Sequence, residues 1–142
     1  MPTQQTWDKH WMNVAILTSK LSKDPTTQVG AVLLTPDNRQ CAIGYNGFAR
    51  GIEETPEMWN NRDVKLKYVI HAEENALLNT PFSPKDCSIY ITHQPCPKCI
   101  IRVLQAGIIR VIYNLPYTKM GDVDIWQVHA NKFKEIRQLD ID

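Results

Sequence analysis

The sequence predicts an α/β fold in which a mixed sheet of about five strands is flanked by helices. Three observations lead to this fold class: an amphipathic segment near the N-terminus, several short runs rich in β-branched residues, and helical patterns that alternate with these runs. With 142 residues, the chain is long enough to bury about two-thirds of its unfolded surface. We therefore expect residues 1–142 to form a single domain.

The N-terminal part is predicted to form one helix and one hairpin. Apolar side chains at helical spacing predict a core-facing helix over about 6–23, which ends before Pro25 because a residue that precedes proline disfavours helix. The apolar runs 29–34 and 41–45 flank a turn-rich segment, which predicts two antiparallel strands. The chain from about 46 to 68 is expected to be one long irregular loop. Loops of that length in a compact domain are usually functional or disordered.

Helices and strands alternate in the remainder of the chain. The expected segments are helices at 71–79, 97–106 and 122–129 and strands at 88–92, 108–113 and 133–139. Gly107 suits the C-cap of the second of these helices. A strand, a helix and a further strand joined by short connections imply a right-handed parallel crossover. The predicted sheet is therefore mixed, with an antiparallel hairpin and a parallel part.

Two short motifs contain the residues expected to carry chemistry. His71 is followed by Ala72 and Glu73, and Cys96 and Cys99 form a C-x-x-C pair after a proline. Three protein ligands plus one water is the coordination of a catalytic zinc, whereas a structural zinc usually takes four protein ligands. Glu73 would then lie beside the metal without binding it, placed to move protons to and from that water. The motifs predict a hydrolytic zinc site at two helix starts, where free backbone N–H groups stabilise thiolates.

Other interpretations of these residues stay open at this stage. A lone C-x-x-C pair is also found in redox proteins and in structural zinc sites, and a zinc-stabilised nucleotide-binding module without turnover would use similar ligands. Glu73 favours catalysis, because a structural site has no need of a carboxylate there. His10, His93 and His129 have no partner motif and are expected to be non-catalytic.

Composition limits the partners and the compartment. Sixteen basic and 15 acidic residues give a net charge of +1, so no electrostatic footprint for a long nucleic acid is visible. No apolar run reaches the length of a membrane span, and the N-terminus lacks a signal-peptide pattern, so we expect a cytoplasmic protein. Cys41 and Cys87 lie in or beside predicted strands and are expected to be small buried apolar residues.

The sequence resembles the deoxycytidylate (dCMP) deaminases of the cytidine deaminase-like superfamily. The H-x-E and P-C-x-x-C motifs are the signature of zinc nucleobase deaminases, and segments 23–32, 44–51 and 105–108 resemble further parts of the dCMP deaminase pattern. The resemblance extends from about residue 11 to residue 117. It implies a three-layer α-β-α cytidine deaminase-like fold.

The resemblance also implies a reaction and its regulation. Members hydrolyse dCMP to dUMP and ammonia with a catalytic Zn²⁺, which supplies dUMP for dTTP synthesis. The resemblance further implies activation by dCTP and inhibition by dTTP, bound with Mg²⁺ at a second site, in a homo-hexamer. Because the two metal motifs occur throughout the superfamily, a deaminase of another nucleotide, a nucleobase or a nucleic acid remains the alternative.

The remaining site residues are implied by the resemblance or are candidates by residue type. Asn46 is expected to contact the sugar or phosphate, and the backbone N–H groups near Ala72 are expected to hold the pyrimidine carbonyl. Candidates for the 5′-phosphate are Ser22, Thr26, Arg62, Tyr117 and Lys119. The expected allosteric nucleotide site comprises Gln28, Gly44, Tyr45, Gly47, Phe48, Arg50 and Gly51.

Overall fold

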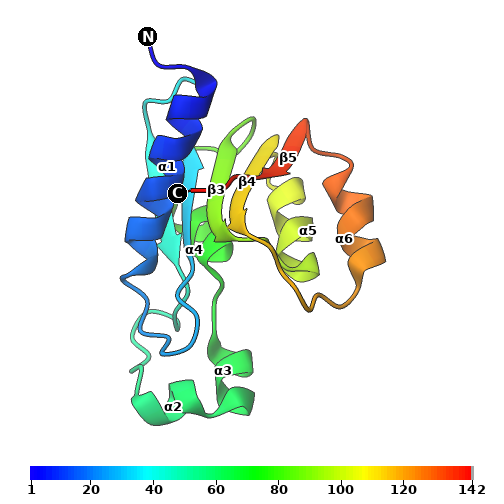
Figure 1. The fold of residues 1–142 in the computed structure, drawn as a ribbon. Coiled ribbons are helices and arrows are strands. Elements are labelled where there is room, and N and C mark those ends of the chain that lie inside the picture. The colour runs from blue at the N-terminus through cyan, green and yellow to red at the C-terminus, as the bar shows by residue number, and fades with distance from the viewer. Residues whose placement is uncertain (142) are drawn as a thin grey trace.

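A five-stranded mixed sheet with helices on both faces forms the protein, as a computed structural model that describes residues 1–141 shows (Figure 1). The strands are β1 (Gly30–Leu34), β2 (Cys41–Tyr45), β3 (Ser88–His93), β4 (Arg110–Leu115) and β5 (Glu135–Gln138). The helices are α1 (Gln4–Ser19), α2 (Pro56–Asn60), α3 (Arg62–Tyr68), α4 (Ala72–Asn79), α5 (Pro97–Gln105) and α6 (Val123–Ala130). None of the helices within residues 1–141 is both long and apolar enough to cross a membrane.

The strand order is β2-β1-β3-β4-β5, which confirms the predicted mixed sheet. β1 pairs antiparallel with both β2 and β3, so the expected hairpin is present at one edge. β3, β4 and β5 run parallel to one another, with α5 and α6 as the connections between them. The parallel crossover through the cysteine motif therefore forms as predicted.

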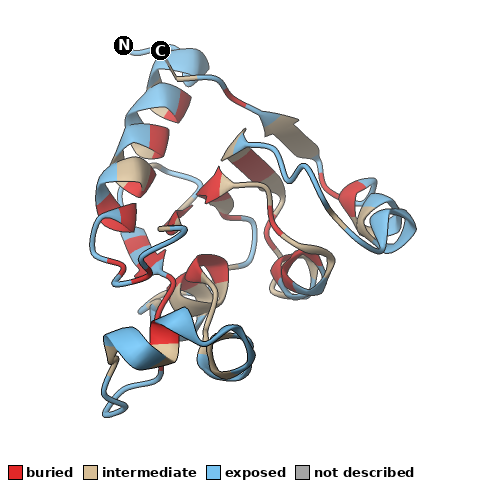
Figure 2. Ribbon diagram, turned by 60° about the horizontal axis from the view of Figure 1, so that its bottom comes forward, coloured by how far each residue is buried: buried red, intermediate tan, exposed pale blue. Residues whose placement is uncertain are grey.

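Alternate residues of the central strands supply two apolar cores, one on each face of the sheet. Val32, Tyr90 and Ile112 point to the face covered by α1, where they pack with Met12 and Ala15. The intervening residues of the same strands pack on the opposite face against α4 and α5. Figure 2 shows the resulting pattern on α1, whose outer surface is exposed while its inner surface is buried. The three layers match the predicted α-β-α architecture.

The predicted end of the first helix was wrong. α1 ends at Ser19 rather than near residue 23, and Leu21, an apolar residue inside the predicted helix, is 56% exposed. The hydroxyls of Thr18 and Ser19 donate to the carbonyls of Val14 and Ile16. Such side-chain hydrogen bonds compete with the backbone ladder and weaken the helix at its last turn.

The irregular loop predicted over 46–68 was also wrong in its second half, which folds into α2 and α3. Both helices carry standard start signals: the Thr55 hydroxyl accepts a hydrogen bond from the Met58 N–H, and the Asn61 side chain accepts one from the Val64 N–H. Each helix is too short to show a clear apolar period. Figure 1 shows this pair of helices beyond the end of the sheet, below α4.

Aromatic stacking anchors α2 and α3 to the preceding loop. The ring centres of Phe48 and Trp59 lie 4.5 Å apart, and the ring centre of Tyr68 lies 5.7 Å from that of Phe48.

The prediction that Cys41 and Cys87 are both buried is half right. Cys87 is buried, whereas Cys41 is exposed because β2 is the edge strand and its alternate residues face outward.

Candidate active site

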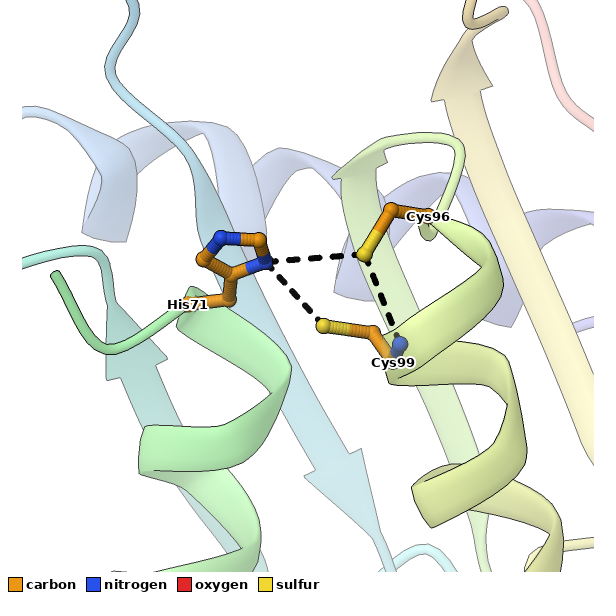
Figure 3. Close-up of side chains that lie close together, drawn as sticks. All are labelled: His71, Cys96 and Cys99. Atoms are coloured by element: carbon orange, nitrogen blue, oxygen red, sulfur yellow. Dashed lines mark hydrogen bonds between the residues drawn. The ribbon is translucent and has the colours of Figure 1, made fainter. Parts of the chain in front are cut away.

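Two helix starts bring His71, Cys96 and Cys99 together beside the sheet. Figure 3 shows the imidazole at the start of α4 and the two thiols at the start of α5 turned toward one another. Nδ1 of His71 lies 3.1 Å from Sγ of Cys99 and 3.8 Å from Sγ of Cys96. One ligand atom from each residue lies within 4.8 Å of the other two.

This cluster fits a tetrahedral zinc ion with one open position. Zinc binds thiolate at about 2.3 Å and imidazole at about 2.0–2.1 Å, which places tetrahedral nitrogen and sulfur ligands about 3.6 Å apart. The two observed nitrogen-to-sulfur separations of 3.1 and 3.8 Å bracket that value. The donor set of one imidazole and two thiols is one that zinc prefers. These three side chains are therefore able to hold a zinc ion.

Local hydrogen bonds fix both ligand segments. Cys96 is the N-cap of α5, and its sulfur accepts a hydrogen bond from the Cys99 N–H at 3.4 Å. His71 is the N-cap of α4, and its N–H donates to the Glu74 carboxylate at 3.1 Å. Glu74 in turn lies 3.5 Å from Arg102 on α5. These contacts join the two helices that carry the ligands.

Hydrogen bonding within the cluster moves the pKa values of the two thiols in opposite directions. Hydrogen bonding from Cys99 and from His71 lowers the pKa of Cys96, although burial opposes the shift. The same hydrogen bond to Cys96, together with burial, raises the pKa of Cys99. Binding of a divalent metal requires both sulfurs as thiolates and would displace any thiol proton that remains.

Glu73 is placed beside this cluster but is not part of it. The side chain lies two residues after His71, is 4% exposed and lines the adjacent cavity. Burial raises the pKa of Glu73 to about 7, with nearby His71 opposing the shift. A buried carboxyl with a pKa near neutrality is suited to accept and return protons.

The cavity has a volume of about 480 Å³, a size typical of small-molecule sites. We call the lining residues His71, Ala72, Glu73 and Cys96 its metal side, and the lining residues Asp24, Thr27, Asn46 and Lys65 its loop side. The remaining wall includes His93, Gln94, Tyr117 and Thr118. The structure therefore opens a nucleotide-sized space directly beside the metal cluster.

Only part of the predicted substrate set lines this cavity. Asn46, Ala72 and Tyr117 do so, as expected from the sequence. The other four candidates for the phosphate, which are Ser22, Thr26, Arg62 and Lys119, are absent from the cavity wall. Ser22 is buried instead, and its hydroxyl donates to the carbonyl of Asn46 at 2.9 Å.

The hydrogen bonds of Asn46 restrict what it can offer to a ligand. Its Oδ1 accepts from the N–H of Val29 at 2.8 Å, and its Nδ2 donates to Asp24 at 3.2 Å and to the Thr27 carbonyl at 3.0 Å. Both amide hydrogens are therefore engaged, and the acceptor Oδ1 is what remains available. Such a group suits a sugar hydroxyl better than a phosphate oxygen.

Several wall residues were missed by the sequence reasoning. From the sequence, Asp24 is expected only to help end the first helix, and Lys65 is one of four cations, with Arg50, Arg62 and Lys67, of which one could bind a phosphate. The proximity of Asp24 and Lys65 depends on how α3 folds back. Gln94 is fixed by the Tyr117 N–H, which donates to its side-chain oxygen at 2.9 Å. His93, which has no motif partner, nevertheless lies in the wall with its Nδ1 2.9 Å from the Thr92 hydroxyl. In the sequence, the one indication that His93 lies at the site is its position next to Gln94 and near Cys96.

The residues expected at an allosteric site lie outside the cavity wall, and several have a packing role. A Cβ at Gly44 would lie 2.3 Å from the carbonyl oxygen of Ala72, so only glycine lets β2 approach α4 this closely. Phe48 is buried against Trp59. Gly51 has a φ of +82°, in the region that favours glycine, within the loop that follows β2.

The other four expected allosteric residues make local or bridging contacts. Gln28 donates to the Ser22 carbonyl, the Tyr45 carbonyl accepts from Asn75, Gly47 pairs with Ile70, and Arg50 binds the Asn79 side chain. The stretch that contains these residues is thus fastened to α4 and to the segment before it.

The family model for the cytidine and deoxycytidylate deaminase zinc-binding region matches residues 5–115. Human deoxycytidylate deaminase is 40% identical over 113 residues, which cover 75% of this chain and 64% of that protein. An uncharacterised deaminase of Aliivibrio fischeri is also 40% identical, over 74% of this chain and 70% of that protein. The aligned part of the chain thus spans slightly under two-thirds of the human relative.

Solved structures extend the likeness to the whole fold. The dCMP deaminase of cyanophage S-TIM5, solved in complex with dCMP and dUMP, superposes with a TM-score of 0.78 at 27% identity and covers 97% of this chain and 100% of that one. Acinetobacter baumannii RibD superposes with a TM-score of 0.66 at 21% identity over 96% of this chain and 36% of its own, which shows a shared fold only.

Proposed function

Because the chain belongs to the cytidine and deoxycytidylate deaminase family, we propose that it hydrolyses dCMP to dUMP and ammonia. The observation that carries this proposal is the buried Glu73 carboxyl, which lines a nucleotide-sized cavity beside one imidazole and two thiols. The likeness to the cyanophage enzyme solved with dCMP and dUMP favours this substrate. The match to human deoxycytidylate deaminase supports it independently.

In the proposed reaction, three residues bind the metal and Glu73 transfers the protons. His71, Cys96 and Cys99 would hold Zn²⁺, which supplies a Lewis acid able to make water nucleophilic near neutral pH. Glu73 accepts one proton from the attacking water and delivers it to N3 of cytosine as oxygen bonds to C4. Glu73 then moves the second proton of that water to the amine on C4, which leaves as ammonia while the C4 carbonyl of uracil forms. Atoms balance as cytosine plus water giving uracil plus ammonia.

The remaining contacts orient the nucleotide. The backbone N–H groups at the start of α4, around Ala72, are available for the pyrimidine carbonyl because the first N–H groups of a helix lack internal partners. Oδ1 of Asn46 is available for a sugar hydroxyl. Tyr117 lines the same cavity and offers a hydroxyl to the phosphate.

We also propose the wider properties that the resemblance implies. These are the supply of dUMP for dTTP synthesis, activation by dCTP and inhibition by dTTP with Mg²⁺ at a second site, and assembly as a homo-hexamer. The segment from Gly44 to Gly51 supports the regulatory part through its likeness to the dCMP deaminase pattern. The four free cysteines suit the reducing cytoplasm, where we propose that the protein acts.

The test is deamination of dCMP by purified, zinc-loaded protein, followed by ammonia release or by the ultraviolet change from cytosine to uracil. We expect turnover, and stimulation of that turnover by dCTP with Mg²⁺. Turnover without stimulation would retain the enzyme and remove the regulatory proposal. Absence of turnover with zinc bound would contradict the proposal, and activity on deoxycytidine, guanine or RNA would then identify another deaminase.

A further inference from the structure

We propose that Lys65 recognises the phosphate of the nucleotide and so determines the preference of this site for nucleotides over nucleosides. This inference rests on the proposed function. Of the four cations between residues 50 and 67 that the sequence leaves open as phosphate binders, it selects the one that lines the cavity.

Lys65 is the one lysine or arginine among the described residues that line the cavity. The wall also contains the carboxyl groups of Asp24 and Glu73. A phosphate ester carries up to two negative charges near neutral pH and is bound in proteins mainly by charge-assisted hydrogen bonds. A nucleotide that fills this cavity therefore requires a cation, and Lys65 is the group available.

The ammonium group of Lys65 is held in a defined place. Its Nζ lies 2.7 Å from Oδ2 of Asp24, and the side chain is only 23% exposed. The same nitrogen lies 5.7 Å from the centre of the Trp59 ring, within the range of a cation–π contact. Lysine is a flexible side chain with considerable rotamer entropy, and these two contacts reduce the cost of ordering it when a ligand binds.

The Asp24 carboxylate accepts hydrogen bonds from several groups besides Lys65. Asp24 therefore does not fully neutralise the charge of Lys65. Oδ1 of Asp24 accepts from the N–H groups of Thr26 and Thr27 at 2.9 and 3.3 Å. Oδ2 accepts from Nδ2 of Asn46 at 3.2 Å in addition to Lys65. An ammonium group has three N–H donors, and one of them is engaged by Asp24. The others remain for phosphate oxygens, with the hydroxyls of Thr27 and Tyr117 nearby in the same wall.

The basic residues expected from the sequence to bind phosphate lie elsewhere. Arg62 and Lys119 are both exposed and outside the cavity wall. Lys67, two positions after Lys65 on α3, is likewise exposed and outside the wall. Lys67 therefore provides a matched control with the same charge on the same helix.

The experiment compares two substrates that differ only in the phosphate. For Lys65→Met, which keeps an unbranched apolar side chain of similar length, we expect kcat/KM for dCMP to fall about 10- to 100-fold, the range for a lost hydrogen bond to a charged group, mainly through KM. Turnover of deoxycytidine should change little. Lys65→Arg should retain part of the preference for dCMP, and Lys67→Met should behave as the wild type.

The other outcomes separate this inference from the proposed function. An equal loss for dCMP and deoxycytidine in Lys65→Met, or an unchanged preference for dCMP, would overturn the role of Lys65 in phosphate recognition. If the zinc-loaded wild type turned over neither substrate, the proposed function would fail, and calorimetric binding of dCMP and deoxycytidine would decide on Lys65 alone. Tighter binding of dCMP that is lost in Lys65→Met supports the inference, and binding unaffected by the substitution contradicts it.

Discussion

The metal side and the loop side of the cavity are built in different ways. His71 and Glu73 stand at one helix start and Cys96 and Cys99 at another, and both helices pack on the sheet core. The loop side includes Asp24 and Lys65, which come from a turn and from a short helix beyond the sheet and are joined by polar contacts. Under the proposed function, reactivity is fixed by the core of the fold, whereas substrate selection depends on attached segments.

The largest effect is expected on the metal side, from Cys96→Ala. Loss of one of three protein ligands, and of the N-cap acceptor of α5, should abolish zinc retention and turnover together and lower the melting temperature. Metal analysis of the purified variant and thermal unfolding measure this. Cys41→Ala is the control, because Cys41 is exposed on the edge strand. A Cys96→Ala variant that retained stoichiometric zinc would show that the cluster is not the metal site.

A second prediction tests whether the core positions the metal side. In Gly44→Ala the new methyl group would lie 2.3 Å from the Ala72 carbonyl oxygen and 2.4 Å from the Ala76 nitrogen, so α4 must shift. We expect a loss of about 1–3 kcal/mol in the free energy of unfolding, as for overpacking in general, and a lower kcat. Gly121→Ala, where no atom lies within 4 Å of the added Cβ, is the matched control. Equal behaviour of the two variants in urea unfolding would argue against a rigid metal side.

A third prediction concerns the loop side, where the effect should be smaller and confined to stability and substrate binding. Asp24→Asn removes the charge that pairs with the partly buried Lys65, and a loss of about 1 kcal/mol in the free energy of unfolding is expected. Zinc content should not change. The control is Asp63→Asn, an exposed acid in the first turn of α3. Loss of zinc in Asp24→Asn would show that the two sides are not independent.

The smallest expected effect is the pH dependence of the stabilisation that Asp24 provides. Burial alone would raise the pKa of Asp24, but hydrogen bonds from Lys65, Thr26 and Thr27 outweigh it and leave the pKa below the usual 3.8. The stabilisation by Asp24 is therefore fully present above the pKa of the unfolded chain and is lost as the pH falls through the lower folded-state value. The difference in unfolding free energy between wild type and Asp24→Asn should be constant near neutrality and shrink below about pH 4. A difference that grows in acid would contradict this assignment.

The same contrast explains how far the sequence could be used for prediction. The clustering of His71, Cys96 and Cys99 was predictable because these residues lie in two short motifs, each at the start of a helix. The central strands were predictable because their β-branched runs are distinct, and the mixed sheet is confirmed.

The loop side was not predictable for equally physical reasons. The contact between Asp24 and Lys65 joins segments that are far apart in the chain, and it depends on where α3 lies, beside the stacked Phe48 and Trp59. Short capped helices lack an apolar period, so they were expected to be loop. The phosphate candidates Arg62 and Lys119 were chosen by charge alone, which does not report where a side chain points.

The most direct test of the account is Glu73→Gln, which keeps the shape of the side chain but removes its ability to carry protons. Turnover of dCMP by the zinc-loaded variant should fall by about 100- to 10,000-fold, the usual range for general acid–base groups, with zinc content and melting temperature close to wild type. Glu57→Gln, at an exposed acid of α2, should have normal activity. Near-normal turnover of dCMP by Glu73→Gln would contradict the assignment of Glu73 as the proton carrier and with it the proposed mechanism.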